Sequence, residues 1–211
     1  MRSLVIETST AACSVALIER GIEQGLVIAA AHEVVGRGHA ERLVPMIAAL
    51  PEGGRAGHIL VDCGPGSFTG VRVGIAAARG LALGWGAEVQ GYSSLALVAA
   101  AGLAENPDWP NLAVVLEGGH GEVFMQLFDA QLLSIGALAS LKPEAAIDAI
   151  GGRPAIGNGV RFLRPFDSGA ILVEALPRAA DAILLPPALT ALPPRPIYGR
   201  APDAKPLAVP V

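Results

Sequence analysis

The sequence has few aromatic residues and very little lysine. Aromatic residues make up 4% of the 211 residues although 52% of the chain is hydrophobic, so the core must be built mainly from Ala, Val, Leu and Ile. Only Lys142 and Lys205 are lysines, and the formal net charge is -4. Because phosphate contacts dominate nucleic-acid affinity, this charge balance argues against a protein that holds nucleic acid by itself.

Metal motifs, disulfide patterns and long hydrophobic runs are also missing. Cys13 and Cys63 lie in apolar segments without a metal or redox spacing, which is typical of reduced, buried thiols. The histidines are not spaced to share a helix face, so no metal site is predicted. The N-terminal segment is too short and too interrupted for a signal sequence or a membrane span. We therefore expect a cytoplasmic protein without membrane contact.

The most informative stretch that is present is a glycine turn at residues 63–74. It follows an apolar segment and opens a long Ala- and Gly-rich helix, so it exposes backbone N–H groups that could bind an anion. It lacks the ending of a P-loop, and Thr69 replaces the third glycine of the dinucleotide fingerprint. Pro65 breaks the nucleophile-elbow pattern around Ser67. No catalytic residue is predicted, because Ser67 and Thr69 fit helix capping better than nucleophilic attack.

Two halves of the chain begin in the same way. Residues 3–7 and 13–18 predict a β-hairpin with a hydroxyl-rich loop, and residues 112–116 and 123–128 predict a second hairpin. The repetition indicates two units of similar construction.

A polar, proline-rich segment separates these halves. It marks a boundary that gives domains 1–104 and 105–211. The second domain is expected to be smaller and to end in an extended proline-rich tail over residues 186–211.

Two helices of the first half have unusual faces. Leu43 and Met46 share an apolar face, but Pro45 disfavours a helix interior, so either a kink or a helix that begins near Val44 is expected. In the following helix, several glycines leave one face nearly flat. Glycine costs about 1 kcal/mol in a helix interior, so a flat face indicates a partner that packs close to the backbone. The glycines in question are Gly70, Gly74 and Gly84.

Three ordered motifs resemble the TsaB family, also called YeaZ. They are the opening strand and loop at residues 4–17, the segment 39–47 and the glycine turn at 64–74, and residues 121–124 and 196–200 match more distantly. The resemblance implies an α/β fold of the actin/hexokinase-like (ASKHA) type. Such a fold has two subdomains, each with a mixed sheet that is opened by a β-hairpin and flanked by helices.

That family is known as the non-catalytic partner of TsaD, which forms threonylcarbamoyladenosine at the adenosine next to the tRNA anticodon. The resemblance thus implies a scaffold that activates TsaD rather than an enzyme, with TsaE as a further partner and a homodimer when alone. It implies tRNA contact only through the complex, and leaves ATP or ADP at the partner interface open. Family members pair through helices of the first subdomain. The matching interface residues here are His39, Glu41, Leu43, Met46, Arg72, Gly74, Ala78 and Arg79.

Two other functions stay open. A glycoprotease-type peptidase would use Ser67 or Thr69 as its nucleophile. A nucleotide-binding enzyme would use the cofactor-binding candidates Glu7, Thr8 and Ser9, because an acidic residue at the end of the first strand could orient water or magnesium. Glu7 stands where the family pattern has aspartate.

Overall fold

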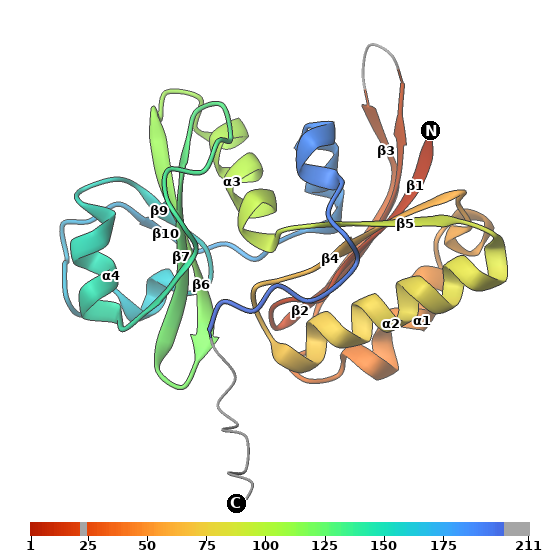
Figure 1. Ribbon diagram of the computed structural model, residues 1–211, viewed down its shortest axis with the longest axis horizontal. Helices are drawn as coiled ribbons and strands as arrows, with labels where there is room; N and C mark the ends of the chain where they lie inside the picture. Colours follow the sequence, from red (N-terminus) through yellow and green to blue (C-terminus); the bar gives the residue numbers. More distant parts are fainter. Residues whose placement is uncertain (22–24, 201–211) are drawn as a thin grey trace, which may run out of the picture.

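The computed structural model describes residues 1–21 and 25–200. Figure 1 shows two lobes side by side, each built around one sheet. The first sheet has the order β3 (Gly25–Val34), β2 (Ala12–Arg20), β1 (Arg2–Glu7), β4 (His58–Asp62) and β5 (Glu88–Tyr92). Strand β1 pairs antiparallel with β2 and parallel with β4, so the sheet is mixed as predicted.

The second sheet repeats this plan. Its order is β10 (Leu172–Val173), β9 (Ala155–Ile156), β6 (Asn111–Gly119), β7 (Glu122–Asp129) and β8 (Ala139–Leu141). Strands β6 and β7 form an antiparallel hairpin, and β6 pairs parallel with β9. Both predicted hairpins are therefore confirmed.

Helices cover the first sheet on both faces. Helices α1 (His39–Ala48) and α2 (Phe68–Trp85) pack on one face, where Leu4 and Ile6 of β1 enter their core. Helix α3 (Ser94–Glu105) lies between the lobes, and Val5 enters the core on that side. Alternate residues of β1 thus serve two cores, as the period of a strand requires.

Short helices complete the chain. They are α4 (Pro143–Ile150) against the second sheet and the 3-10 turns η1 (Pro51–Gly54), η2 (Val160–Phe162), η3 (Ala179–Leu184) and η4 (Pro187–Thr190). Within the described residues, no helix combines the length and the apolar character needed to cross a membrane.

Helix α1 begins at His39, so the alternative of a start near Val44 is wrong. Pro45 lies inside it and cannot donate to the carbonyl of Glu41. Both residues face solvent, so water can satisfy that carbonyl and the helix continues.

The C-terminal segment returns to the first lobe. Gly91 and Leu192 exchange backbone hydrogen bonds of 2.7 and 3.0 Å, and the Ile197 N–H donates to the Cys63 carbonyl at 2.7 Å. One core cluster also joins α3 and η3 to strands of both sheets. The first lobe is thus not built from residues 1–104 alone, while the boundary itself stays a prediction. The extended tail predicted over residues 186–211 is only partly confirmed, because Pro187–Thr190 form the 3-10 turn η4, whereas residues 191–200 contain no helix. Residues 201–211 lie outside the described residues.

Candidate functional site

The glycine turn joins β4 to α2. Asp62 ends β4, and its Oδ1 accepts a hydrogen bond of 2.8 Å from the Gly64 N–H. Gly64 has a φ of 86°, a conformation that favours glycine, and its peptide bond to Pro65 is cis. The Ser67 hydroxyl accepts from the Gly70 N–H at 3.2 Å, so the predicted capping role is confirmed.

This turn is closed against the loop between β1 and β2. The Ser67 N–H donates to the Ser9 carbonyl at 2.6 Å. The Thr8 hydroxyl donates to the Gly70 carbonyl at 2.9 Å. A side chain at Gly66 or Gly70 would collide with the backbone of Ser9 or Thr8. The glycines therefore serve an internal contact between two loops.

Two buried carboxyl groups lie behind the turn, at the carboxyl ends of β1 and β4. Glu7 accepts hydrogen bonds from the Ser9 N–H at 2.8 Å, the Ser9 hydroxyl at 2.6 Å and the Tyr92 hydroxyl at 3.2 Å. Burial raises the pKa of Glu7 to about 7, although these bonds oppose the shift. Burial and the charge of Glu7 likewise hold the pKa of Asp62 well above its usual range. At neutral pH the pair therefore tends to retain a proton.

The predicted nucleotide-binding residues do not fit a nucleotide within this chain. Glu7, Thr8 and Ser9 are at most 1% exposed and are bonded to one another or to neighbouring backbone. A phosphate group would also have to lie beside the Glu7 and Asp62 carboxyl groups, which oppose a second negative charge. These three residues are thus closed in the structure of this chain, and a nucleotide site at them stays a prediction.

The candidate nucleophiles lack a base. Among the described residues, neither Ser67 nor Thr69 bonds to a histidine or a carboxylate, and the only hydrogen bond of the Ser67 hydroxyl is the cap. In the same part of the chain, no three His, Cys, Asp or Glu side chains are grouped so that they could hold a metal ion. The turn therefore offers a helix cap rather than a catalytic group.

A serine and a histidine do meet elsewhere, at a place that the sequence did not indicate. The Ser3 hydroxyl lies 2.9 Å from Nδ1 of His58, and Nε2 of His58 lies 3.2 Å from the Gln90 side chain. The parallel register of β1 and β4 brings the two side chains together, and no local sequence motif predicts the pair. Ser3 is fully buried, so the pair is closed to a substrate.

Five of the eight predicted interface residues lie inside the first lobe. Leu43, Met46 and Ala78 belong to its core, and His39 bonds to the Ala12 carbonyl. A side chain at Gly74 would collide with the Thr8 hydroxyl. The apolar and glycine faces of the helices thus pack inward in this chain, and contact of these five residues with a partner stays a prediction. The three that remain exposed are Glu41, Arg72 and Arg79.

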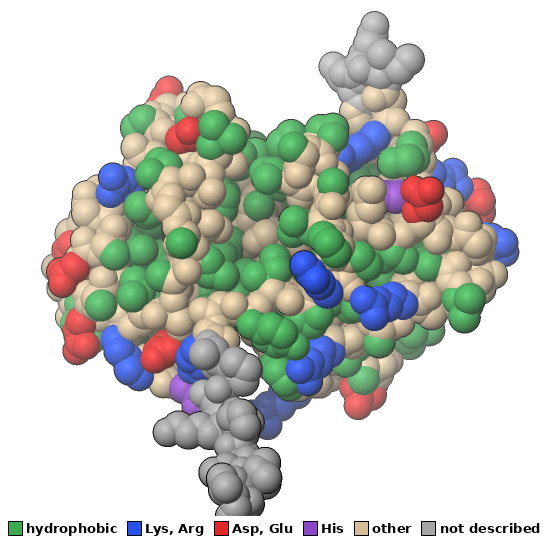
Figure 2. Space-filling view, in the orientation of Figure 1, with side chains coloured by type: hydrophobic (Ala, Val, Ile, Leu, Met, Phe, Trp, Pro, Cys, Tyr) green, Lys and Arg blue, Asp and Glu red, His purple; other side chains and the backbone are tan. Residues whose placement is uncertain are grey.

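The outward faces of α1 and α2 carry small and apolar residues instead. Leu83 is 89% exposed, and Gly80 and Gly84 have open space where a side chain would project. Figure 2 shows hydrophobic side chains on the surface over α2. We name this surface the docking face. It comprises Val44, Pro45 and Ala48 of α1 and Ala76, Gly80, Leu83 and Gly84 of α2, all exposed.

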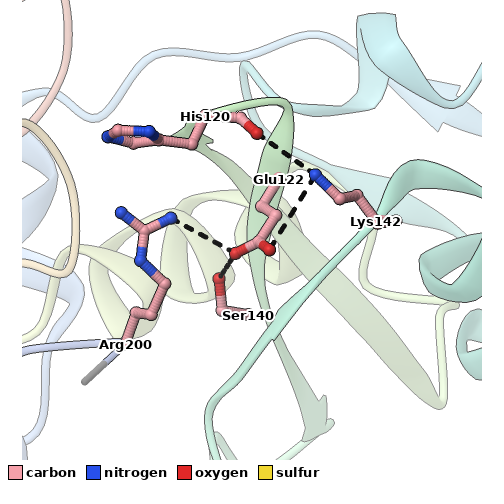
Figure 3. Close-up of polar contacts among 5 residues, drawn as sticks. All are labelled: His120, Glu122, Ser140, Lys142 and Arg200. Carbon is pink, nitrogen blue, oxygen red and sulfur yellow. Dashed lines mark hydrogen bonds and ion pairs between the residues drawn. The ribbon is translucent and has the colours of Figure 1, made fainter. Parts of the chain in front are cut away.

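A polar cluster holds the end of the described chain against the second lobe (Figure 3). Glu122 accepts from the Ser140 hydroxyl at 2.7 Å and pairs with Arg200 at 3.4 Å and Lys142 at 4.0 Å. The Ser140 hydrogen bond, then Arg200 and Lys142, lower the pKa of Glu122. The motifs at 121–124 and 196–200, which the sequence treats separately, thus meet in space.

Comparison with known proteins identifies relatives of this chain. Residues 30–152 match the family model described as TsaD, tRNA N6-adenosine threonylcarbamoyltransferase. The chain is 38% identical over 131 residues to the tRNA threonylcarbamoyladenosine biosynthesis protein TsaB of Escherichia coli strain K12, covering 59% of this chain and 53% of that protein. The match thus spans about half the length of the curated relatives.

Two solved structures from Pseudomonas aeruginosa match nearly the whole chain. An uncharacterized protein described as similar to peptidase YEAZ has a TM-score of 0.75 at 30% identity, covering 94% of this chain and 99% of that one. The structure of YeaZ has a TM-score of 0.73 at 28% identity, covering 93% and 99%. Because both lobes are included, these matches confirm the predicted actin/hexokinase-like fold.

Proposed function

Because the chain belongs to the TsaB family, also called YeaZ, we propose that it acts in threonylcarbamoyladenosine formation on tRNA as a non-catalytic partner of TsaD. It scaffolds and activates TsaD at the adenosine next to the anticodon. In this proposal TsaE joins the complex and tRNA is held by the assembly. When the chain is alone, the docking face forms a homodimer instead. Any ATP or ADP lies at the interface with TsaD.

The observation that carries the proposal is the docking face. Leu83 does not stand alone, because Ala76, Gly80 and Gly84 are exposed on the same side of α2 at spacings of three or four positions. Contiguous apolar surface of this kind marks interaction sites.

Gly80 and Gly84 let a partner helix approach the α2 backbone closely. The sequence assigned this role to Gly84 together with Gly70 and Gly74, and the last two pack against the Thr8 loop instead. The closed glycine turn and the unassisted Ser67 favour this binding role over peptidase or nucleotide chemistry.

Substitution of the docking face tests the proposal. Leu83→Arg places a charge in the centre of the proposed contact and should abolish co-elution with TsaD in size-exclusion chromatography, because an unpaired buried charge is costly. Leu133→Arg, at an exposed leucine of the second lobe, is the matched control and should leave the complex intact.

The same variants are then tested in a strain depleted of this protein. We expect the wild type and Leu133→Arg to restore threonylcarbamoyladenosine in tRNA, measured by mass spectrometry of nucleosides, and Leu83→Arg to fail. Normal modification in the depleted strain would refute the proposed function.

A further inference from the structure

Arginine and aromatic side chains gather where the C-terminal segment crosses the beginning of α2. Figure 2 shows basic side chains beside hydrophobic ones over this part of the molecule. Phe68 is 60% exposed and Tyr198 57% exposed, and the arginines are exposed as well. We name this surface the arginine–aromatic patch. It comprises Phe68, Arg72, Arg79, Arg195 and Tyr198.

The patch is held in place by contacts between the two segments. Arg79 donates to the Pro194 carbonyl at 2.7 Å, and Arg72 donates to the Tyr198 hydroxyl at 3.0 Å, so the C-terminal segment runs alongside α2. The Arg72 guanidinium lies 3.4 Å above the centre of the Phe68 ring. The rings of Phe68 and Tyr198 are 6.4 Å apart. Flat groups are thus positioned before any ligand arrives, which lowers the entropic cost of binding.

The charge of the patch is not neutralised. Arg2, Arg42 and Arg161 each pair with a glutamate. In contrast, no ion pair involves Arg72, Arg79 or Arg195 within the described part of the chain. An acidic chain with a net charge of -4 thus presents a local positive surface.

Resting on the function proposed above, we propose that the arginine–aromatic patch contacts unpaired bases and phosphates of the tRNA that the complex modifies. Unpaired bases stack on aromatic rings and guanidinium planes, whereas bases inside an RNA duplex are hidden from side chains. The arginines supply the phosphate contacts that such binding needs. The net negative charge of the chain agrees with a contact that adds to the affinity of a complex.

The patch and the docking face meet on the outer side of α2, where Arg79 lies beside Gly80 and one turn before Leu83. Phe68 and Arg72 lie nearer the beginning of the helix. Phe68 and Leu83 are 15 positions apart on one helix, which separates them by roughly 22 Å along its axis. Arginines make up three of the five residues of the patch, and a guanidinium can both stack on a base and bind a phosphate. The positive charge and the flat groups of the patch together favour RNA, and contact with a second protein surface is an outcome that the test below distinguishes.

The test measures RNA affinity of the assembled complex with TsaD. A fluorescently labelled anticodon stem–loop RNA is titrated over a range of salt concentrations. Combined Arg72→Gln, Arg79→Gln and Arg195→Gln should weaken binding at least tenfold and reduce the slope of log affinity against log salt by about 2, since each lost phosphate contact removes about 0.7. Combined Arg55→Gln, Arg164→Gln and Arg178→Gln removes the same charge from exposed arginines elsewhere and should leave the slope unchanged.

Stacking is tested at a single ring. Tyr198→Ala should weaken RNA binding at least fivefold, because a base–aromatic stack contributes about 1 kcal/mol or more. Tyr198→Phe keeps the ring and loses only the hydroxyl contact with Arg72, so it should bind as the wild type does.

Three results would overturn the inference or separate it from the proposed function. An unchanged salt slope in the patch variant overturns it, and so does loss of TsaD from that variant, which would make the patch a protein contact. Failure of the wild-type chain to bind TsaD refutes the proposed function instead. In that case the same RNA titration is carried out at low salt on the chain alone. Weaker RNA binding by the patch variant than by the control variant would support the RNA contact, and equal binding would overturn it.

Discussion

At the scale of single residues, the buried carboxyl pair has the clearest consequence. Glu7 and Asp62 lie where parallel strands end, and both are fully buried. The sequence identified Glu7 as a strand end beside a hydroxyl-rich loop, and this placement is confirmed. The sequence could not show that the Tyr92 hydroxyl donates to Glu7 or that the Asp62 carboxyl interacts with it, because these contacts join residues that are distant along the chain.

The Glu7 carboxyl should make stability depend on pH. Its pKa rises from 4.5 to about 7 on folding, so the folded chain binds the proton more tightly and stability falls as pH rises through that window. Glu7→Gln has no ionisable group at this position, so it should not lose stability over this pH range. We expect the variant to exceed the wild type at pH 8 by on the order of 3 kcal/mol, since the pKa rises from 4.5 to about 7 and one pKa unit is worth about 1.4 kcal/mol.

Urea denaturation at a series of pH values checks this prediction. Glu144→Gln, at an exposed glutamate of α4, is the control and should follow the wild type. Parallel stability curves for the wild type and Glu7→Gln would contradict the account of the buried pair.

At the scale of elements, α2 illustrates what can and what cannot be predicted from the sequence. Its beginning was predictable, because Ser67 before an apolar run is a typical cap. Its orientation was not. Both the Val71 face and the Gly74 face are apolar or small, and periodicity alone cannot say that both are buried. Val71 enters the core of the first lobe, and the Thr8 loop packs on Gly74.

Opposite responses at two glycines of α2 follow from this orientation. Gly74→Ala forces a methyl group against the buried Thr8 hydroxyl, which is itself bonded to Gly70, and should cost about 1 to 3 kcal/mol. Gly80→Ala meets open space in a helix interior and should stabilise the fold by up to about 1 kcal/mol. Urea denaturation followed by tryptophan fluorescence compares the two, and changes of the same sign would contradict the assigned faces.

At the scale of the whole molecule, repeated hairpins and the family resemblance made the two-lobed fold predictable. The return of the C-terminal segment was not, because its bonds to Gly91 and Cys63 span about half the chain and leave no local pattern. After these contacts the segment reaches the second lobe, where Arg200 pairs with Glu122, so it links the two lobes. The exposed surface overlaps with the predicted interface only in part. Glu41, Arg72 and Arg79 lie on the outer sides of α1 and α2, whereas the other five predicted residues lie on the inner sides, which form the core.

Amide hydrogen exchange, measured on the chain alone and mixed with TsaD, tests this account most directly. The account predicts that TsaD slows exchange in α1 and α2, and that the strands of the second lobe exchange at the same rate with and without the partner. Protection centred on the second lobe, or no change in α1 and α2 when the complex forms, would contradict it.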